Sequence, residues 1–212
     1  MGASFATHVL FLTWFFTATF SLSFFFKAES NSSLAIKKRK NLCFFKAESN
    51  VSCCEKEKNA LLSLKRGLRG LTDPYNWSSL SSWSDQEDCC RWDGVHCDNK
   101  TAQVTELSVK HVGGKINPSL VELEFLNYLN LSKNFFNCTS IPRVLGSMVN
   151  LTHLDLHDAQ FCGHIPHQLG NLSSLCYLNL GGYESNLYVD NLHLMFHLSS
   201  MQHLDLSHTK LR

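Results

Sequence analysis

The sequence predicts an α/β fold: a right-handed solenoid of stacked repeats, with a parallel β-sheet on its concave face and an irregular or 3-10 convex side. Three observations predict this fold. Three of the four prolines, Pro118, Pro142 and Pro166, are spaced 24 residues apart. The segments around them share the pattern L-x-x-L-x-L, and a cysteine-rich segment with helical periodicity precedes them. A fixed period of this length is typical of solenoids, in which each unit buries its apolar side only against its neighbours.

The repeats occupy residues 104–212, and their shared pattern is the leucine-rich-repeat signature. Because successive side chains of a strand point to opposite faces, the leucines of L-x-L should face the core and the x residues solvent. The I-P-x-x-L-G element, present at Ile141 and Ile165, should form the convex return. A degenerate copy begins at Val104, further copies begin at Leu126, Leu151 and Leu175, and a shortened copy begins at Met201.

One asparagine, Asn134, stands where leucine-rich repeats use a side chain to satisfy backbone groups of the turn after the strand. Buried backbone groups need hydrogen-bond partners, and the other copies lack this amide. We therefore expect irregular turns after Leu156 and Leu180. The equivalent positions of the other copies hold Val112, Ala159, Tyr183 and Thr209.

Residues 52–103 should cap the first edge of the solenoid, because an open sheet edge invites aggregation. The first part of this segment predicts a short amphipathic helix, and the second part a hairpin tied by disulfides. Trp83 and Trp92 are expected to be core residues of the cap, the alternative being a role in stacking on a ligand. The apolar residues at helical spacing are Ala60, Leu61, Leu64, Leu68 and Leu71.

The order of motifs in the cap makes the comparison with a known family specific. The segments CCEKEKNALL, LSSW, DCC and WDGVHC are followed by repeats that contain I-P-x-x-L-G. From Ser52 to the end, the chain resembles the amino-terminal part of plant leucine-rich-repeat receptor-like proteins of the pathogen-perception type, which are related to polygalacturonase-inhibiting proteins. The resemblance implies disulfides between Cys53 and Cys89 and between Cys90 and Cys97. It also implies a protein or peptide ligand, which can be pathogen-derived, and a co-receptor kinase in the full-length family.

The first 30 residues are expected to be a secretory leader, because residues 9–26 are almost wholly apolar. A retained membrane anchor is the alternative, since about 18 apolar residues can span a bilayer. Apart from this leader we expect no transmembrane segment. Residues 31–51 are expected to be a disordered linker that arose by tandem duplication or a gene-model error, because the heptapeptide FFKAESN occurs at residues 25–31 and again at 44–50.

Cysteine content and glycosylation acceptors favour the secretory pathway and an extracellular or plasma-membrane surface location. The chain has nine cysteines, a density that suits an oxidising compartment. Cys138 and Cys162 occupy equivalent places in adjacent coils and either bridge or remain buried free thiols; the partners of Cys43, Cys54 and Cys176 are left open. We expect N-glycosylation at Asn76, Asn99, Asn130, Asn137, Asn150 and Asn171, and further acceptor sequences occur at Asn31 and Asn50.

Composition and motifs exclude several classes of function. The formal net charge of +1 makes nucleic acid an improbable partner. No nucleophile-base set and no phosphate-binding glycine loop occur, so we predict that the protein is not an enzyme and needs no cofactor. His153, Asp155 and His157 share one strand face, but strand alternation alone produces this spacing, so we predict no metal site.

The predicted function is binding of a protein or peptide by an extracellular leucine-rich-repeat module that serves plant defence. The alternatives are a soluble inhibitor of a cell-wall polygalacturonase and a non-functional gene fragment. The sequence stops at Arg212 inside a repeat, so we expect a truncated form. Histidines at positions 153, 157, 203 and 208 should make binding pH-sensitive. The expected ligand-binding residues of the concave face are Tyr128, Asn130, Lys133, His153, Asp155, His157, Tyr177, Asn179, His203 and Asp205.

Overall fold

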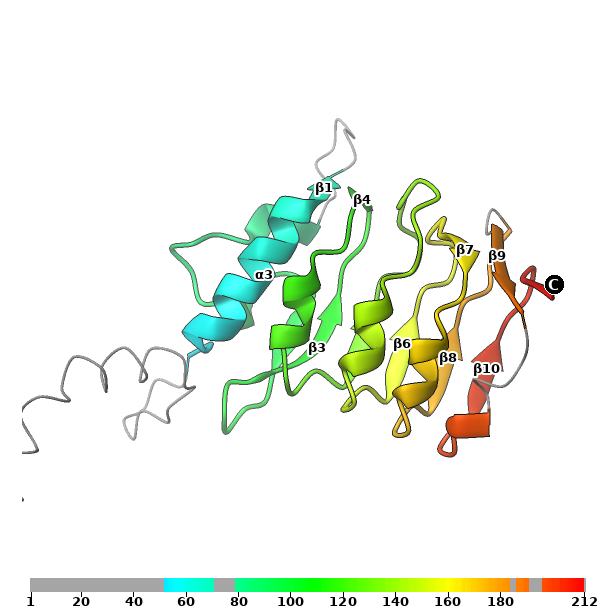
Figure 1. Cartoon of the computed structure of the whole chain (residues 1–212). Coiled ribbons are helices and arrows are strands. Elements are labelled where there is room, and N and C mark those ends of the chain that lie inside the picture. The colour runs from blue at the N-terminus through cyan, green and yellow to red at the C-terminus, as the bar shows by residue number, and fades with distance from the viewer. Residues whose placement is uncertain (1–51, 71–78, 184–185, 191–195, 212) are drawn as a thin grey trace, which may run out of the picture. The chain divides into compact units, whose positions relative to one another are not determined.

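The computed structural model describes residues 52–70, 79–183, 186–190 and 196–211 (Figure 1). The expected leader, residues 1–30, and the expected linker, residues 31–51, lie outside the described residues. Asn76 and Leu71 also lie outside them.

Helix α3 (Glu55–Gly67) is the expected amphipathic helix of the cap. Two carboxylates in its first turn and two basic residues in its last turn complement the helix dipole. Its buried apolar residues are Ala60, Leu61 and Leu64, and Leu68 directly after the helix is also buried. The helix lies against the convex side of the first coil, where the Ser119 hydroxyl donates to the carbonyl of Ala60 at 3.0 Å.

Short elements complete the cap and lead into the repeats. The predicted hairpin pairs β2 with β3 in antiparallel register. A second antiparallel pair, β1 with β4, joins the end of α3 to the first coil, which the sequence did not indicate. The elements are β1 (Leu68–Gly70), η1 (Ser79–Ser82), η2 (Cys89–Arg91), β2 (Val95–Cys97), β3 (Val104–Ser108) and β4 (Val112–Gly114).

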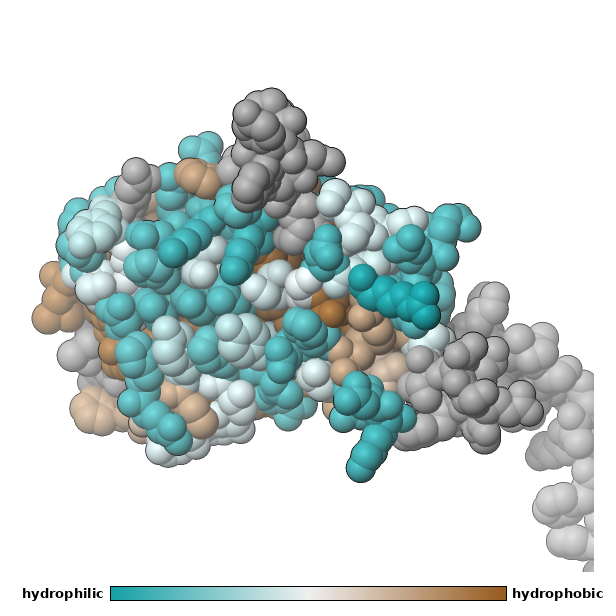
Figure 2. All heavy atoms as spheres, turned by 180° about the vertical axis from the view of Figure 1, so that it is seen from behind, coloured by the Kyte–Doolittle hydropathy of each residue, from teal (hydrophilic) through white to brown (hydrophobic). Residues whose placement is uncertain are grey.

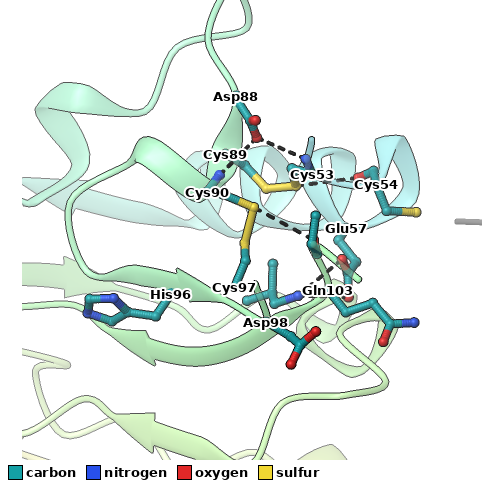
Figure 3. Close-up of a disulfide and its surroundings, with 12 residues drawn as sticks. Cys53, Cys54, Glu57, Asp88, Cys89, Cys90, His96, Cys97, Asp98 and Gln103 are labelled. Atoms are coloured by element: carbon teal, nitrogen blue, oxygen red, sulfur yellow. Dashed lines mark hydrogen bonds between the residues drawn. A yellow bond between two sulfur atoms is a disulfide. The ribbon is translucent and has the colours of Figure 1, made fainter. Parts of the chain in front are cut away.

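Two disulfides hold the cap together, with the pairing that the family resemblance implied. Cys53 bonds to Cys89 and Cys90 bonds to Cys97, so the bridges tie α3 to η2 and η2 to β2 (Figure 3). Cys54 is also disulfide-bonded. Each bridge restricts the unfolded chain, and such a restriction typically contributes about 2–4 kcal/mol to stability.

Trp83 and Trp92 form the centre of the cap, as predicted. Each side chain is 2% exposed, and the two rings stack with their centroids 5.3 Å apart. The indole N–H of Trp83 donates to the carbonyl of Asp93 at 3.0 Å. Burial of both rings makes them structural residues, so the alternative of a ligand-stacking role is wrong.

The strands of the repeats and β2 of the cap form a six-stranded sheet in the order β10-β8-β6-β5-β3-β2, with every pair from β3 to β10 parallel. Figure 1 shows the strands of the repeats following one another along the chain, with the green to yellow 3-10 turns of the repeats on the viewer's side of them. The strands of the sheet beyond β3 are β5 (Tyr128–Asn130), β6 (His153–Asp155), β8 (Tyr177–Asn179) and β10 (His203–Asp205).

The leucines of the repeat pattern form continuous buried rows between the coils. The central leucine of each strand is fully buried in the first four copies. The residue two positions later, a valine in the first copy and a leucine in the others, is at most 2% exposed. One coil alone could not bury these side chains, so stacking of the coils creates the core. The two rows contain Leu107, Leu129, Leu154 and Leu178, and Val109, Leu131, Leu156 and Leu180. In the last copy Leu204 is 40% exposed and Leu211 is 69% exposed.

The convex side consists of 3-10 turns and a second sheet. Each turn begins at or next to a repeat proline, whose fixed φ suits the first turn of a helix. The second sheet is parallel, in the order β11-β9-β7. Each of its strands follows one strand of the six-stranded sheet along the chain. These elements are η3 (Pro118–Glu122), η4 (Arg143–Ser147), η5 (His167–Asn171), β7 (Cys162–His164), β9 (Asn186–Val189) and β11 (Lys210–Leu211).

Asn134 has the turn-stabilising role that its position predicted. It is fully buried; its amide nitrogen donates to the carbonyls of Val109 (2.7 Å) and Leu131 (2.8 Å), and its amide oxygen accepts from the N–H of Val112 (2.9 Å). The next copy has Ala159 at this place, and its turn differs in that Gln160 adopts a positive φ of 55°.

Cys138 and Cys162 form a disulfide between adjacent coils. Of the two alternatives that the sequence left open, the bridge is therefore the observed one. The bridge joins the start of β7 to the preceding coil. Cys176 is a free, half-buried thiol.

Candidate ligand-binding face

The outward side of the parallel strands carries two rows of polar and aromatic side chains, which we call the sheet face. In-register pairing of the strands places the first and third residue of every strand in line with those of its neighbours. The ring row contains Tyr128, His153, Tyr177 and His203, and the amide-carboxylate row contains Asn130, Asp155, Asn179 and Asp205.

The rings of the first row stack in one continuous column. His153 lies between Tyr128, at a centroid distance of 4.2 Å, and Tyr177, at 4.0 Å. Tyr177 stacks in turn on His203 at 4.4 Å, and the planes of these three pairs are within 14° of parallel. Neighbouring rings cover both faces of the inner rings. A ligand on the sheet face would therefore meet the ring edges, which carry the hydroxyls of the tyrosines and the imidazole nitrogens of the histidines.

The second row uses one side-chain oxygen to fix the turn after each strand. In the first of these turns the side-chain oxygen of Asn130 accepts from the N–H of Ser132 at 2.9 Å and from its hydroxyl at 2.7 Å. Each later copy forms the same hydrogen bond to the residue two positions on. These bonds join Asp155 to the N–H of His157 (3.0 Å), Asn179 to that of Gly181 (3.0 Å) and Asp205 to that of Ser207 (2.8 Å). These hydrogen bonds hold each side chain of the row against the turn that follows its strand.

The two rows also contact each other. The amide nitrogens of Asn130 and Asn179 donate to the hydroxyls of Tyr128 and Tyr177, each at 3.4 Å. Both asparagines are half-buried in their strands. Of the expected glycosylation acceptors, Asn130 therefore lies within the sheet face, whereas the exposed ones are Asn99, Asn137, Asn150 and Asn171.

His157 and His203 interact with carboxylates of the neighbouring residues. The ring of His157 lies 3.0 Å from a carboxylate oxygen of Asp158, and the side chains of both residues are about one-third exposed. Hydrogen bonds from the N–H and hydroxyl of Ser207 hold the pKa of Asp205 below its usual value, and His157 and His203 lower it further. Burial lowers the pKa of His153; the charge of Asp155 opposes this effect and His203 adds to it.

Eight of the ten expected ligand-binding residues lie in the strands of the sheet, and two do not. β6 ends at Asp155, so His157 belongs to the following turn, and the prediction that it shares the strand with His153 and Asp155 is wrong. Lys133 is exposed in the turn after β5, with a φ of 56°. Sequence reasoning missed Glu106 and Ser108, which β3 places in register with Tyr128 and Asn130. The alternation of VTELSV in the degenerate first copy could have identified them.

A cleft of about 1040 Å³ lies away from the sheet face, between the proline turns of two coils. His164 on its wall lies 3.3 Å from a carboxylate oxygen of Asp190, and both side chains are more than half exposed. Within the described residues, the side chains with metal-ligand spacing are Cys53, Asp88, Cys89 and Cys90, and the three cysteines are already disulfide-bonded. None of the described helices has the length and apolar character needed to cross a bilayer.

The surface seen in Figure 2, opposite the view of Figure 1, is mainly hydrophilic, with small apolar areas. Polar side chains therefore dominate the part of this surface that the structure describes. The sheet face therefore presents hydrogen-bonding and charged groups to its surroundings.

Comparisons with known proteins agree with this architecture. The profile of the leucine rich repeat N-terminal domain matches residues 49–98, and that of the leucine rich repeat matches residues 150–172. Receptor-like protein EIX1 of Solanum lycopersicum is 43% identical over 171 residues, covering 72% of this chain and 16% of the relative. Receptor-like protein EIX2 of the same species is 42% identical, covering 54% of the chain and 12% of the relative. The chain thus spans less than one-fifth of these relatives.

Solved structures share the fold. A plant ice-binding protein superposes with a TM-score of 0.65 at 26% identity, covering 76% of this chain and 50% of that one. The BIR2 ectodomain of Arabidopsis thaliana has a TM-score of 0.63 at 27% identity, covering 73% and 81%. The Arabidopsis receptor kinase HAESA, in complex with the peptide hormone IDA and the co-receptor SERK1, has a TM-score of 0.53 at 26% identity, covering 73% and 30%.

The sequence relatives are receptor-like proteins, and the BIR2 structure is that of an ectodomain, a binding module of leucine-rich repeats. The prediction of a non-enzymatic leucine-rich-repeat protein is confirmed. The chain carries a leucine rich repeat N-terminal domain followed by leucine-rich repeats, and it is homologous to plant receptor-like proteins.

Proposed function

We propose that this chain is the amino-terminal part of an extracellular plant receptor-like module that binds a peptide or protein on its sheet face, in the service of pathogen perception. The observation that carries the proposal is the column of four stacked rings beside a row of fixed amides and carboxylates. The rigid rings present their polar edges in line, so an extended ligand can hydrogen-bond several coils at once.

The homologues support this proposal at a coarser level. Their names are those of receptor-like proteins, and HAESA was solved with a peptide hormone and a co-receptor. By analogy, the partners proposed here are a peptide or protein ligand and a co-receptor kinase. The plant ice-binding protein shares this fold, so the fold alone does not determine which ligand is bound. The side chains of the sheet face must therefore determine the specificity.

The secretory pathway and the cell surface are the proposed location. The disulfides of the cap and of the repeats suit an oxidising compartment, and the exposed acceptor asparagines suit N-glycosylation there. Of the expected glycosylation sites, those whose side chains are exposed are the ones we propose to be modified. They are Asn99, Asn150 and Asn171, and Asn137 only in chains in which Cys138 is still a free thiol.

Selection from a displayed random-peptide library against the secreted, immobilised chain tests ligand binding. Selected peptides should bind the wild-type chain and lose at least tenfold in affinity, about 1.4 kcal/mol, when His153 and Tyr177 are both replaced by alanine. His167→Ala, on the exposed part of η5, is the matched control and should leave the affinity unchanged. Peptides that bind both variants equally would place recognition elsewhere, and inhibition of a purified polygalacturonase would favour the inhibitor function instead.

A further inference from the structure

One glycosylation acceptor shares a residue with a disulfide. The acceptor tripeptide Asn137-Cys138-Thr139 has as its middle residue the cysteine that bonds to Cys162 of the next coil. Asn137 and Cys138 are both exposed, and the buried ring of Phe136 precedes them. The same three residues therefore contain an acceptor for a glycan, at Asn137, and one half of a disulfide, at Cys138.

The closed bridge holds this tripeptide in an unusual conformation. Asn137 has a φ of 51° and Cys138 a φ of 59°, so two consecutive non-glycine residues occupy the left-handed region. Such residues persist only where the surrounding structure holds them. The tripeptide is thus folded tightly and is not extended.

Backbone hydrogen bonds across the coils fix the same residues. The N–H of Cys138 donates to the carbonyl of Gln160 at 2.9 Å, and the N–H of Thr139 donates to that of Phe136 at 3.1 Å. The carbonyl of Thr139 accepts from the N–H of Cys162 at 3.0 Å. The backbone N–H groups of Cys138 and Thr139 are therefore both occupied, and the disulfide adds a covalent link between the same two coils.

A second acceptor, at the junction with the next coil, provides the comparison. Asn150-Leu151-Thr152 has the same first and third residues, and Asn150 is exposed. Neither Asn150 nor Leu151 has a positive φ, and no cysteine lies within this tripeptide. Folding can hide this acceptor too, but no covalent bond closes it.

We propose that closure of the Cys138–Cys162 disulfide prevents N-glycosylation of Asn137, so that thiol oxidation and glycan transfer compete for the same turn. Glycan transfer needs a tripeptide that can leave the fold and enter an enzyme. The bridge removes this freedom, because opening the turn would have to carry Cys162 along with it. Only chains that are still reduced at Cys138 accept the glycan at Asn137.

Both reactions use agents of the secretory pathway. In glycan transfer the side-chain nitrogen of Asn137 bonds to the anomeric carbon of a lipid-diphosphate oligosaccharide, the bond from that carbon to the diphosphate oxygen breaks, and the amide loses a proton. In bridge formation the two thiols lose two protons and two electrons, which reduce the disulfide of a thiol oxidoreductase to a dithiol. The faster reaction determines whether Asn137 carries a glycan.

The test is site-specific glycan occupancy in the full chain expressed through the secretory pathway of plant cells. Cys162→Ser opens the bridge without altering the acceptor tripeptide, and occupancy is measured by mass spectrometry after enzymatic deglycosylation in isotopically labelled water. The whole cellular and secreted pool is analysed, so that a folding defect does not remove chains from the count. Occupancy at Asn137 should rise several-fold in this variant, whereas that at Asn150 should stay the same.

Two results would overturn the proposal. The first is unchanged occupancy at Asn137 in Cys162→Ser, and the second is an equal rise at Asn150, which would indicate only slower folding. Cys138→Ser should behave like Cys162→Ser. If Cys138→Ser alone raised the occupancy, the identity of the middle residue would be the cause, and the bridge would not.

Discussion

The imidazole ring of His153 lies 4.0 Å from the phenol ring of Tyr177, and their planes differ by 9°. The two residues belong to adjacent coils and are 24 positions apart in sequence. In-register pairing of β6 with β8 brings them together. The stacking of the rings on the sheet face thus depends on the register of the strands. Each ring belongs to a different strand, so each can be replaced and tested separately.

Replacing His153 by alanine should destabilise the protein by about 1–2 kcal/mol, because it removes two ring stacks from the middle of the column. Urea denaturation of the secreted chain measures the change. His167→Ala, whose side chain is exposed on η5, should change stability by less than about 0.5 kcal/mol. Equal effects of the two substitutions would show that the ring column contributes nothing to stability.

Binding of a selected peptide to the sheet face should depend on pH between about 5.5 and 7.5, because histidine changes charge in this range. Burial lowers the pKa of His153 in the folded state, so the folded state favours the neutral imidazole. The stability that His153 contributes is therefore present above the pKa of the unfolded state and is lost as the pH falls through the lower pKa of the folded state. Replacing His153, His157, His203 and His208 by glutamine should remove the pH dependence of affinity measured by biolayer interferometry. Replacing the two histidines at 164 and 167 is the control, and a pH dependence that survives the first set but not the second would locate the sensor on the convex side.

Glu57→Gln should stabilise the cap at neutral and higher pH. Glu57 is 2% exposed, and its carboxylate accepts from the N–H of Val104 at 3.2 and 3.3 Å; Figure 3 shows it near the bridges. Burial raises its pKa to about 7, although the hydrogen bond from Val104 opposes this rise. The folded state therefore prefers the protonated acid: its contribution is fully present below the ordinary pKa of 4.5 and is lost as the pH rises through about 7.

The expected gain for Glu57→Gln at pH 8 is about 1–3 kcal/mol, and at pH 4.5 it is close to zero. Glutamine keeps an oxygen for Val104 and removes the charge. Thermal unfolding at both pH values measures the difference, with the exposed Glu55→Gln of the same helix as control. A gain that is equal at both pH values would rule out ionisation of Glu57 as the cause.

Asn134→Ala should cost about 2–4 kcal/mol, because it leaves the buried N–H of Val112 and the carbonyls of Val109 and Leu131 without their partner. Chemical denaturation checks this value, and the exposed Gln202→Ala, one residue before β10, is the control. The adjacent coil already has alanine at the equivalent place, Ala159, so the variant should still fold. A loss no greater than that of the control would mean that water replaces the amide in this turn.

Gly94→Ala should be far more damaging than Gly163→Ala. Both glycines have positive φ values, 77° and 89°, so alanine strains the backbone at both positions. A Cβ at Gly94 would in addition collide with the carbonyl of Ser108, whereas one at Gly163 would meet no atom within 4 Å. We expect a loss of about 1 kcal/mol for Gly163→Ala and failure to secrete a folded cap for Gly94→Ala. Equal yields and equal melting temperatures of the two variants would contradict the steric argument.

Much of the fold follows from the periodic pattern. The leucines of L-x-x-L-x-L form buried rows, the I-P elements lie at the 3-10 turns, and Asn134 bonds the turn that it was expected to bond. Each of these predictions depends on a local rule, either strand alternation or the need of a buried backbone group for a partner. The pairing of Cys53 with Cys89 followed from the family resemblance, because spacing alone does not distinguish Cys53 from Cys54.

The sequence predicted which residues lie on the sheet face, but it did not predict the contacts between them. Alternation was sufficient to name Tyr128, His153, Tyr177 and His203 as outward residues. It could not show that they stack, that β6 ends before His157, or that Glu57 is buried against β3. The bridge between Cys138 and Cys162 was only one of two alternatives.

The chain alone therefore determines which side chains need burial, since apolar periodicity is a property of each repeat. Contacts between repeats, such as the ring column, the second parallel sheet and the coil-to-coil disulfide, depend on how one coil registers against the next. That registration comes from packing of the leucine rows and from hydrogen bonds between strands, both of which exist only after the coils have stacked.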